Sequence, residues 1–136
     1  MQPATVSRLA RFSLALVAIV FVGLGIMCLS APTVLTRLVE IEMRTRIARM
    51  EVRGVYGGFF IGTGVFFLLF SLRPCWHGAG LVAQASIFGG FVLGRSVGIM
   101  FGGAPNPFIA SLLIAEIVGL IIAVALLVAH AAGEMW

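Results

Sequence analysis

Charged residues are scarce in this chain: they make up 10% of its 136 residues, whereas a soluble domain carries about 25%. Lysine is absent, so all the basic side chains apart from histidine are arginines. Cysteine occurs only twice, so a disulfide-stapled secreted domain is excluded. The 17 glycines follow no triplet period, which excludes a collagen. Apolar residues dominate instead, at 61% of the chain with a mean hydropathy of +1.16. Soluble and disordered chains are therefore excluded, and the sequence predicts a polytopic membrane protein.

Four runs with little or no charge are long enough to cross a membrane, since a helix needs about 20 apolar residues to span a hydrocarbon core of about 30 Å. They cover residues 12–31, 55–72, 79–101 and 108–132. Backbone polar groups must be satisfied internally in lipid, so each run is predicted to be a helix. Asn106 is expected to cap the last one, with Pro107 at its first position. We therefore predict one all-α membrane domain over residues 1–136, built as an integral four-helix bundle.

The first run follows Arg8 and Arg11, as the apolar core of a secretory signal would. It is longer than the usual signal core of about 7–15 residues, so we interpret it as an uncleaved anchor. An even number of spans places both termini on one side of the membrane. Arginines are almost balanced between the two sides, and the first helix usually decides the orientation. We expect an inner-membrane protein with both termini in the cytoplasm.

The polar stretch between the first two spans is predicted to form an extra amphipathic helix over residues 33–50. Glu40 precedes Arg44, and Glu42 precedes Arg46, by four residues, the favourable order for ion pairs on a helix. A helical wheel gives two apolar stripes, whereas a surface-lying anchor has one apolar face. Two stripes suggest one contact with the bundle or lipid and a second with a protein partner. The alternative is that one stripe is merely exposed aliphatic surface.

Glycines recur at a spacing of four in the second and third spans. They are Gly54, Gly58 and Gly62, then Gly90, Gly94, Gly98 and Gly102. Glu51 falls on the face of the first ladder when the segment is drawn as an α-helix. Small residues at this spacing let helices approach closely in lipid. We predict a glycine zipper that joins these two spans as an antiparallel pair within one monomer, with a dimerisation face as the alternative.

The ionisable residues inside the spans form the candidate site. A rise of about 1.5 Å per residue places Arg95 about 9 Å from the end of the third span and Glu116 about 13 Å into the fourth, from the same membrane face. An arginine at a helix centre costs about 2.5–3.5 kcal/mol on insertion scales, so we predict that Arg95 pairs with Glu116 or Glu51. Side chains that open the second span share that face, and the candidate binding set is Glu51, Arg53, Tyr56, Arg95 and Glu116.

Two interpretations of this set stay open. In the first, the charges fix the register of the helices and carry out no chemistry. In the second, Arg95 and Glu116 line a pocket for the head group of an amphipathic ligand, with Phe and Leu walls for its tail. The two interpretations favour, respectively, a non-enzymatic accessory or scaffold subunit and a binder of a lipid-like small molecule. A small transporter or membrane enzyme that acts through Arg95 and Glu116 is the alternative.

Motifs of soluble enzymes are missing from the sequence: it has no nucleophile–base pair, phosphate-binding loop or carboxylate dyad, so an enzyme is the less favoured class. Cys75, His77, His130 and Glu134 match no fixed ligand spacing, and we predict no metal site and no cofactor. The arginines other than Arg95 lie at the membrane margins, where lipid head groups are the expected partners. They form no stripe large enough for a nucleic acid.

Several motifs resemble one bacterial family. They are Glu51-Val52-Arg53-Gly54-Val55-Tyr56-Gly57-Gly58, the pair Gly89-Gly90 followed by Gly94-Arg95, the turn Gly103-Ala104-Pro105, and Glu116. This pattern, E-x-R-G-x-Y-G-G with G-G-x-x-x-G-R, is similar to that of small four-helix bacterial membrane proteins known as a domain of unknown function. Gly102 stands where that family often has an acidic residue. The resemblance covers about residue 43 to the C-terminus. It implies that Glu51, Arg53, Arg95 and Glu116 recur together, and it implies no activity.

Overall fold

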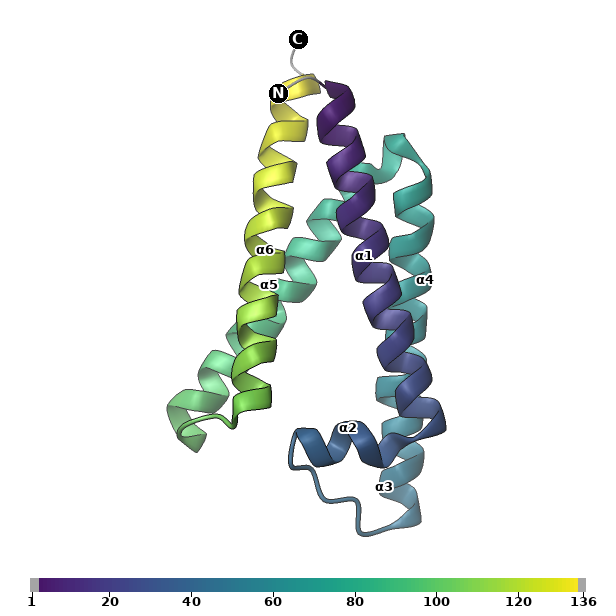
Figure 1. Cartoon of the computed structure of the whole chain (residues 1–136), viewed down its shortest axis with the longest axis vertical. Coiled ribbons are helices and arrows are strands. Elements are labelled where there is room, and N and C mark those ends of the chain that lie inside the picture. The colour runs from purple at the N-terminus through teal and green to yellow at the C-terminus, as the bar shows by residue number, and fades with distance from the viewer. Residues whose placement is uncertain (1–2, 135–136) are drawn as a thin grey trace. The chain divides into compact units, whose positions relative to one another are not determined.

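The computed structural model describes residues 3–134, which fold into helices joined by short turns (Figure 1). The elements are α1 (Pro3–Ser30), α2 (Pro32–Leu38), α3 (Arg46–Glu51), a π-helix (Val52–Gly58), α4 (Phe59–Leu72), a 3₁₀ turn (Pro74–Trp76), α5 (His77–Gly102) and α6 (Pro107–Glu134). No strand occurs among these described residues. The predicted all-α class is thus confirmed.

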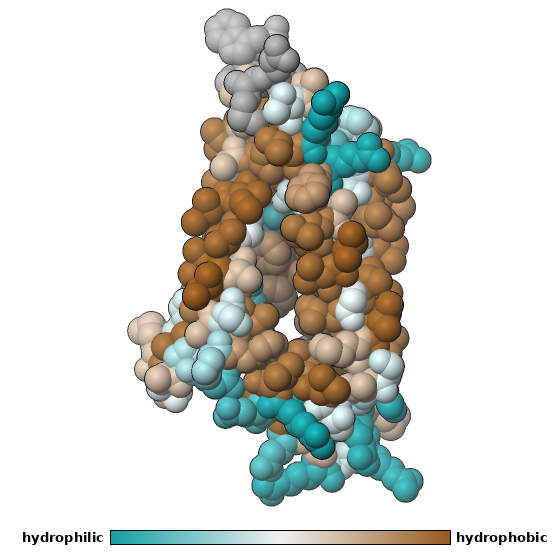
Figure 2. All heavy atoms as spheres, viewed as in Figure 1, coloured by the Kyte–Doolittle hydropathy of each residue, from teal (hydrophilic) through white to brown (hydrophobic). Residues whose placement is uncertain are grey.

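Among the described residues, four helical stretches are long and apolar enough to cross a membrane. They are Ala4–Ser30, Arg46–Leu72, Pro74–Gly102 and Pro107–Ala132. Each contains one of the four predicted runs or nearly all of it, and most of them continue beyond it, because a helix does not end where its apolar composition ends. Figure 2 shows hydrophobic residues over the long helices and hydrophilic residues near the helix ends, among them the segment around α2 and α3. These features are those of a multi-pass helical membrane protein.

The chain divides into two compact units, which are described separately. The first contains residues up to 14 and from 70 onward, and the second contains residues 15–69. In the first unit, α5 and α6 form an antiparallel pair (Figure 1). The start of α1 joins them in an apolar core of Ala10, Leu81 and Leu126.

The turn between α5 and α6 confirms the predicted helix start. Asn106 Oδ1 accepts a hydrogen bond from the backbone N–H of Ile109 at 2.8 Å, and Pro107 is the first residue of α6. Gly103, just after α5, has a φ of 90°, a conformation that favours glycine. These two features reverse the chain and set α6 beside α5.

The second unit packs the rest of α1 against α4. Phe21 meets the rings of Phe60 and Phe67 edge-on, with centroids 5.5 and 6.1 Å apart. Glycines allow the two backbones to approach. A Cβ atom added to Gly25 would lie 2.8 Å from the Ile61 nitrogen, and one added to Gly64 would lie 2.9 Å from the Ala18 oxygen. Since real Cβ atoms do not approach backbone so closely, both positions require glycine.

The predicted glycine ladders do not make these close contacts. A Cβ atom added to any glycine of the two ladders would meet no atom of the same unit within 4 Å. The glycines of the ladders are Gly54, Gly58, Gly62, Gly90, Gly94, Gly98 and Gly102. A spacing of four marks one face of a helix, but it does not show that another helix covers that face. The glycines under close contact in the second unit are Gly25, Gly57 and Gly64.

A π-helix over Val52–Gly58 joins α3 to α4. Its hydrogen bonds run to the fifth residue, so each turn holds more residues than a turn of α-helix. A wheel drawn at 100° per residue therefore does not apply across it. The predicted placement of Glu51 on the face of Gly54, Gly58 and Gly62 assumed such a wheel and does not hold.

The prediction of one continuous helix over residues 33–50 is wrong, because α2 ends at Leu38. Beyond it, the Glu40 N–H donates to the Arg37 oxygen at 3.2 Å and the Ile41 N–H donates to the Thr36 oxygen at 2.8 Å. These two bonds form a Schellman motif, which usually needs glycine at the position that Glu40 occupies with a φ of 57°. This turn ends the helix and reverses the chain, although the helical periodicity of the sequence continues past it.

The helix resumes only at Arg46, where Thr45 is the N-cap. The Thr45 hydroxyl accepts from the Ala48 N–H at 3.1 Å. Residues 41–44 between the two helices are not helical, so the predicted helical spacing between Glu42 and Arg46 is lost. Glu42 pairs instead with Arg44, whose Nε lies 2.6 Å from its carboxylate. The two apolar stripes drawn on a single helix therefore do not form.

Candidate functional site

Arg95 of α5 and Glu116 of α6 form an ion pair inside the first unit. Arg95 Nε donates to both carboxylate oxygens of Glu116, at 2.7 and 3.0 Å. The pairing arises because both residues lie at similar distances from the turn that joins the two antiparallel helices. Glu116 is one of the two partners that the sequence predicts for Arg95. The cost of an unpaired charge in an apolar helix is thus met by a partner across the helix pair.

The two members of the pair differ in exposure. The Glu116 side chain is 10% exposed and that of Arg95 is 26% exposed. The carboxylate is therefore enclosed, whereas part of the arginine side chain reaches the surface of the unit. Arginine stays protonated in proteins and presents donors in a planar fork that suits carboxylates and phosphates. The exposed part of the arginine can therefore donate hydrogen bonds to an anion or a polar head group.

Arg53 belongs to the second unit and caps a helix there. Its Nε donates to the backbone oxygen of Leu29 at 3.0 Å. The last four carbonyls of a helix have no partner within it, and a cation at that end also interacts favourably with the helix dipole. Gly57 packs on the same residue, since a Cβ there would lie 2.7 Å from Leu29 Cδ2. Arg53 and Gly57 therefore fasten the end of α1.

The other predicted site residues also lie in the second unit. Tyr56 packs edge-on against Phe60, with ring centroids 6.0 Å apart, and Glu51 is exposed at the end of α3. Of the five candidates, the structure brings Arg95 and Glu116 into direct contact. The inclusion of Glu51, Arg53 and Tyr56 in one binding set stays a prediction.

Sequence reasoning missed the contacts of two buried polar side chains of the first unit, Gln84 and His77. Ser13 of α1 donates to Gln84 Oε1 at 3.1 Å, and Gln84 Nε2 donates to the backbone oxygen of Gly119 in α6 at 3.3 Å. Gln84 is 1% exposed. One amide side chain therefore connects all three helices of the unit.

His77, at the start of α5, is the second of these side chains. Its Nε2 lies 3.2 Å from the backbone oxygen of Ser71, and its Nδ1 lies 3.2 Å from the Ser7 hydroxyl. A carbonyl oxygen only accepts, so Nε2 donates the hydrogen, and in a neutral ring Nδ1 then accepts from Ser7. Both ring nitrogens are thus engaged. The side chain of Glu134, which the sequence groups with His77, lies outside the described residues.

A helical wheel of α5 contains the signal that was missed. His77, Gln84 and Arg95 are spaced by seven and eleven residues, so at about 100° per residue they lie on one face within about 20°. In the structure each bonds to a different partner. Every buried side-chain nitrogen or oxygen among residues 3–134 has a hydrogen-bond partner. The polar face of α5 therefore contacts both α1 and α6 through side-chain hydrogen bonds.

Comparisons with curated proteins and with solved structures gave no match. A family model described as a domain of unknown function, DUF4345, matches residues 9–127. This range contains all four candidate spans in large part, together with Arg95 and Glu116. The chain therefore belongs to the DUF4345 family.

Proposed function

We propose that this protein binds an amphipathic, lipid-like small molecule within the membrane and holds its polar head against Arg95. One observation carries the proposal: in an ion pair set within long apolar helices, Glu116 is enclosed while Arg95 keeps 26% of its side chain exposed. A guanidinium edge that faces hydrocarbon lacks acceptors, which makes a polar ligand group favourable there. An ionisable residue inside a span is in any case a functional candidate by default.

The surface of α5 beside Arg95 has room for such a ligand. Within the unit, a Cβ on Gly94 or Gly98 would meet no atom within 4 Å. Phe91 and Ile99, one helical turn before and after Arg95, are half-buried and apolar. Both Glu116 oxygens accept from Nε, so the terminal nitrogens of the guanidinium are the donors left for a head group. A carboxylate or a phosphate ester matches their geometry.

A register-fixing role is the second candidate function. It is favoured by the complete pairing of buried side-chain polar atoms in residues 3–134. In that role the pair would need to stay intact, but the identity of the charge on each helix would not matter. Ligand binding differs, because the cation must project from α5 beside its open surface.

Exchanging the two charges separates these roles. We expect the double variant Arg95→Glu with Glu116→Arg to fold, because it keeps an ion pair, and to lose the ligand, because the cation now projects from α6. Native mass spectrometry of protein purified in mild detergent should show a lipid-sized adduct on the wild type, retained about tenfold less by the exchanged protein, equal to about 1.4 kcal/mol.

Arg73→Gln is the matched control for this experiment. Arg73 belongs to the same unit and lies over the Trp76 ring at 4.8 Å, away from the pair, so its loss should leave the adduct unchanged. A folded, charge-exchanged protein that keeps the full adduct would overturn the binding proposal and leave the register role. A wild-type protein that carries no adduct would overturn it as well.

We further propose that the protein resides in a bacterial inner membrane with both termini in the cytoplasm. The exposed Cys75 tests the orientation. It follows the second span, so we expect it in the cytoplasm, where a membrane-impermeant maleimide reaches it only after the cells are opened. Cys28 is buried, and the variant Cys28→Ala controls for labelling there. Labelling of Cys75 in intact cells would show that the orientation is the opposite of the proposed one.

A further inference from the structure

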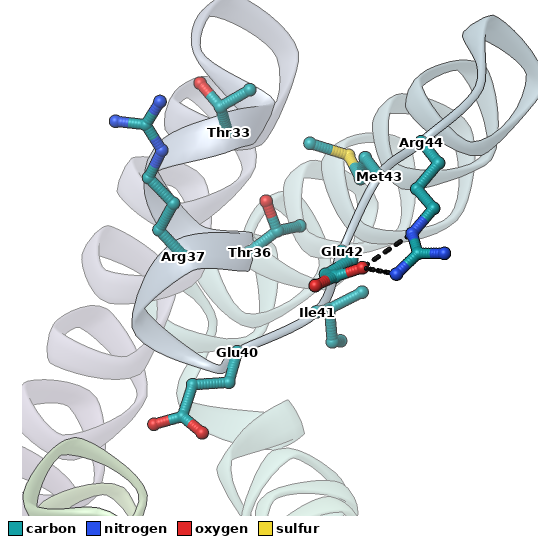
Figure 3. A pocket seen from close by; sticks show the side chains of 8 residues that line it. All are labelled: Thr33, Thr36, Arg37, Glu40, Ile41, Glu42, Met43 and Arg44. Atoms are coloured by element: carbon teal, nitrogen blue, oxygen red, sulfur yellow. Dashed lines mark hydrogen bonds and ion pairs between the residues drawn. The ribbon is translucent and has the colours of Figure 1, made fainter.

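A hollow of about 500 Å³ lies in the second unit, between α2 and the segment that follows it (Figure 3). It exists because the turn at Glu40 reverses the chain, so that the non-helical residues 41–44 run beside α2. The lining residues are Thr33, Thr36, Arg37, Glu40, Ile41, Glu42, Met43 and Arg44. The hollow therefore combines cationic, hydroxyl and apolar side chains.

The two arginines of the hollow differ in their partners. Arg44 pairs with Glu42, but the two side chains are 84% and 71% exposed, so water screens this pair strongly. Figure 3 draws no ion pair between the exposed Arg37 and the other residues that line the hollow. Figure 3 shows the Arg37 side chain extending toward Thr33, one helical turn earlier, while the Glu40 carboxylate points the opposite way. Arg37 and Thr33 thus present a cation and a hydroxyl at one end of the hollow.

The surroundings of the hollow are both basic and apolar. Between Arg37 and Arg53 the chain has five arginines and three glutamates, a net charge of +2. Val34, Leu38 and Ile41 are 45%, 42% and 46% exposed, and Ile47 and Met50 of α3 are exposed further. The segment also connects two candidate spans, so it lies at the margin of the bilayer. A basic, partly apolar surface at that depth is typical of contact with anionic lipid.

We infer that this hollow binds the phosphate of an anionic phospholipid head group. Arg37 and Thr33 donate to the phosphate oxygens, Arg44 turns from Glu42 to the same group, and the acyl chains lie along the exposed apolar side chains of α2 and α3. A lipid fits better than free phosphate, because the apolar rim would gain nothing from an inorganic ion. The inference is independent of the proposed function, since it involves other residues in the other unit.

The test is a titration of full-length protein in detergent with phosphatidylglycerol, followed by native mass spectrometry. For Arg37→Gln with Arg44→Gln we expect the apparent Kd of the first bound lipid to rise about tenfold, because two charge-assisted contacts are lost. The matched control is Arg46→Gln with Arg49→Gln, which removes the same charge from the same segment outside the hollow, and should change the Kd less than about threefold. Glu42→Gln should tighten binding, because it releases Arg44.

Three results would overturn the inference. Equal weakening in the two arginine pairs would show general attraction to basic residues rather than a site. Binding that Arg37→Gln with Arg44→Gln leaves unchanged, in a protein whose helical circular dichroism is intact, would remove the hollow from the interaction. Displacement of phosphatidylglycerol by inorganic phosphate at equal concentration would show a free-phosphate site, whereas resistance to it supports a lipid.

Discussion

Glu116→Ala is expected to destabilise the protein by about 3–5 kcal/mol, because it leaves the charge of Arg95 without a partner inside the first unit. The lower end of this range applies, since Arg95 is 26% exposed and part of its charge reaches the surface of the unit. Denaturation in mixed micelles, followed by tryptophan fluorescence, measures the effect. Arg95→Ala should cost a similar amount, because it leaves the enclosed Glu116 carboxylate alone.

The double variant Arg95→Leu with Glu116→Leu is the control for this prediction. Replacing both members of a buried pair by apolar residues is often neutral or stabilising, so the double variant should be more stable than either single one. Single variants as stable as the wild type would show that the pair contributes nothing to folding. A double variant less stable than either single one would contradict the assignment of the cost to an unpaired charge.

Gly25→Ala and Gly64→Ala are each expected to destabilise the second unit by about 3 kcal/mol, the upper end of the usual cost of overpacking. The new methyl group at either position would lie within 3 Å of backbone atoms of the facing helix, which cannot move aside as a side chain can. Thermal unfolding in detergent, followed by circular dichroism, measures the loss, because α1 and α4 must separate.

Each of these variants has a matched control two residues away on the same helix. A Cβ on Gly23 or Gly62 would meet no atom within 4 Å in this unit. Gly23→Ala and Gly62→Ala should therefore raise stability by about 0.5–1 kcal/mol each, the usual gain when alanine replaces glycine inside a helix. Equal effects at Gly62 and Gly64 would contradict the assigned contact face of α4.

The long helices and the ion pair could be predicted because both depend on a large energetic cost. Apolar runs of membrane length must be helical in lipid, and the cost of a lone Arg95 demands a carboxylate, of which Glu116 is one of few within the spans. The start of α6 at Pro107 was also predictable, because Asn106 is a local signal. Each of these signals is contained in the composition or in a few adjacent residues.

The break in the predicted helix over residues 33–50 could not be read from periodicity. Glu40 adopts a φ of 57°, a conformation that costs a residue with a Cβ about 1–2 kcal/mol. A glutamate in the sequence gives no indication of this conformation. The close-contact glycines were equally hidden, because a ladder such as Gly54, Gly58 and Gly62 does not identify the helix that covers it. The helix cap made by Arg53 depends on the position of Leu29, far away in the chain.

The π-helix has a consequence for the whole second span. A π turn holds one residue more than an α turn, so Val52–Gly58 amounts to an α-helix with a single inserted residue. Removing one residue there would close the surplus and rotate α3 by about 100° relative to α4. Arg53 would leave the Leu29 carbonyl, and α3 would turn about the helix axis. The direction in which α3 presents its side chains therefore depends on the number of residues in the second span as much as on their chemical nature.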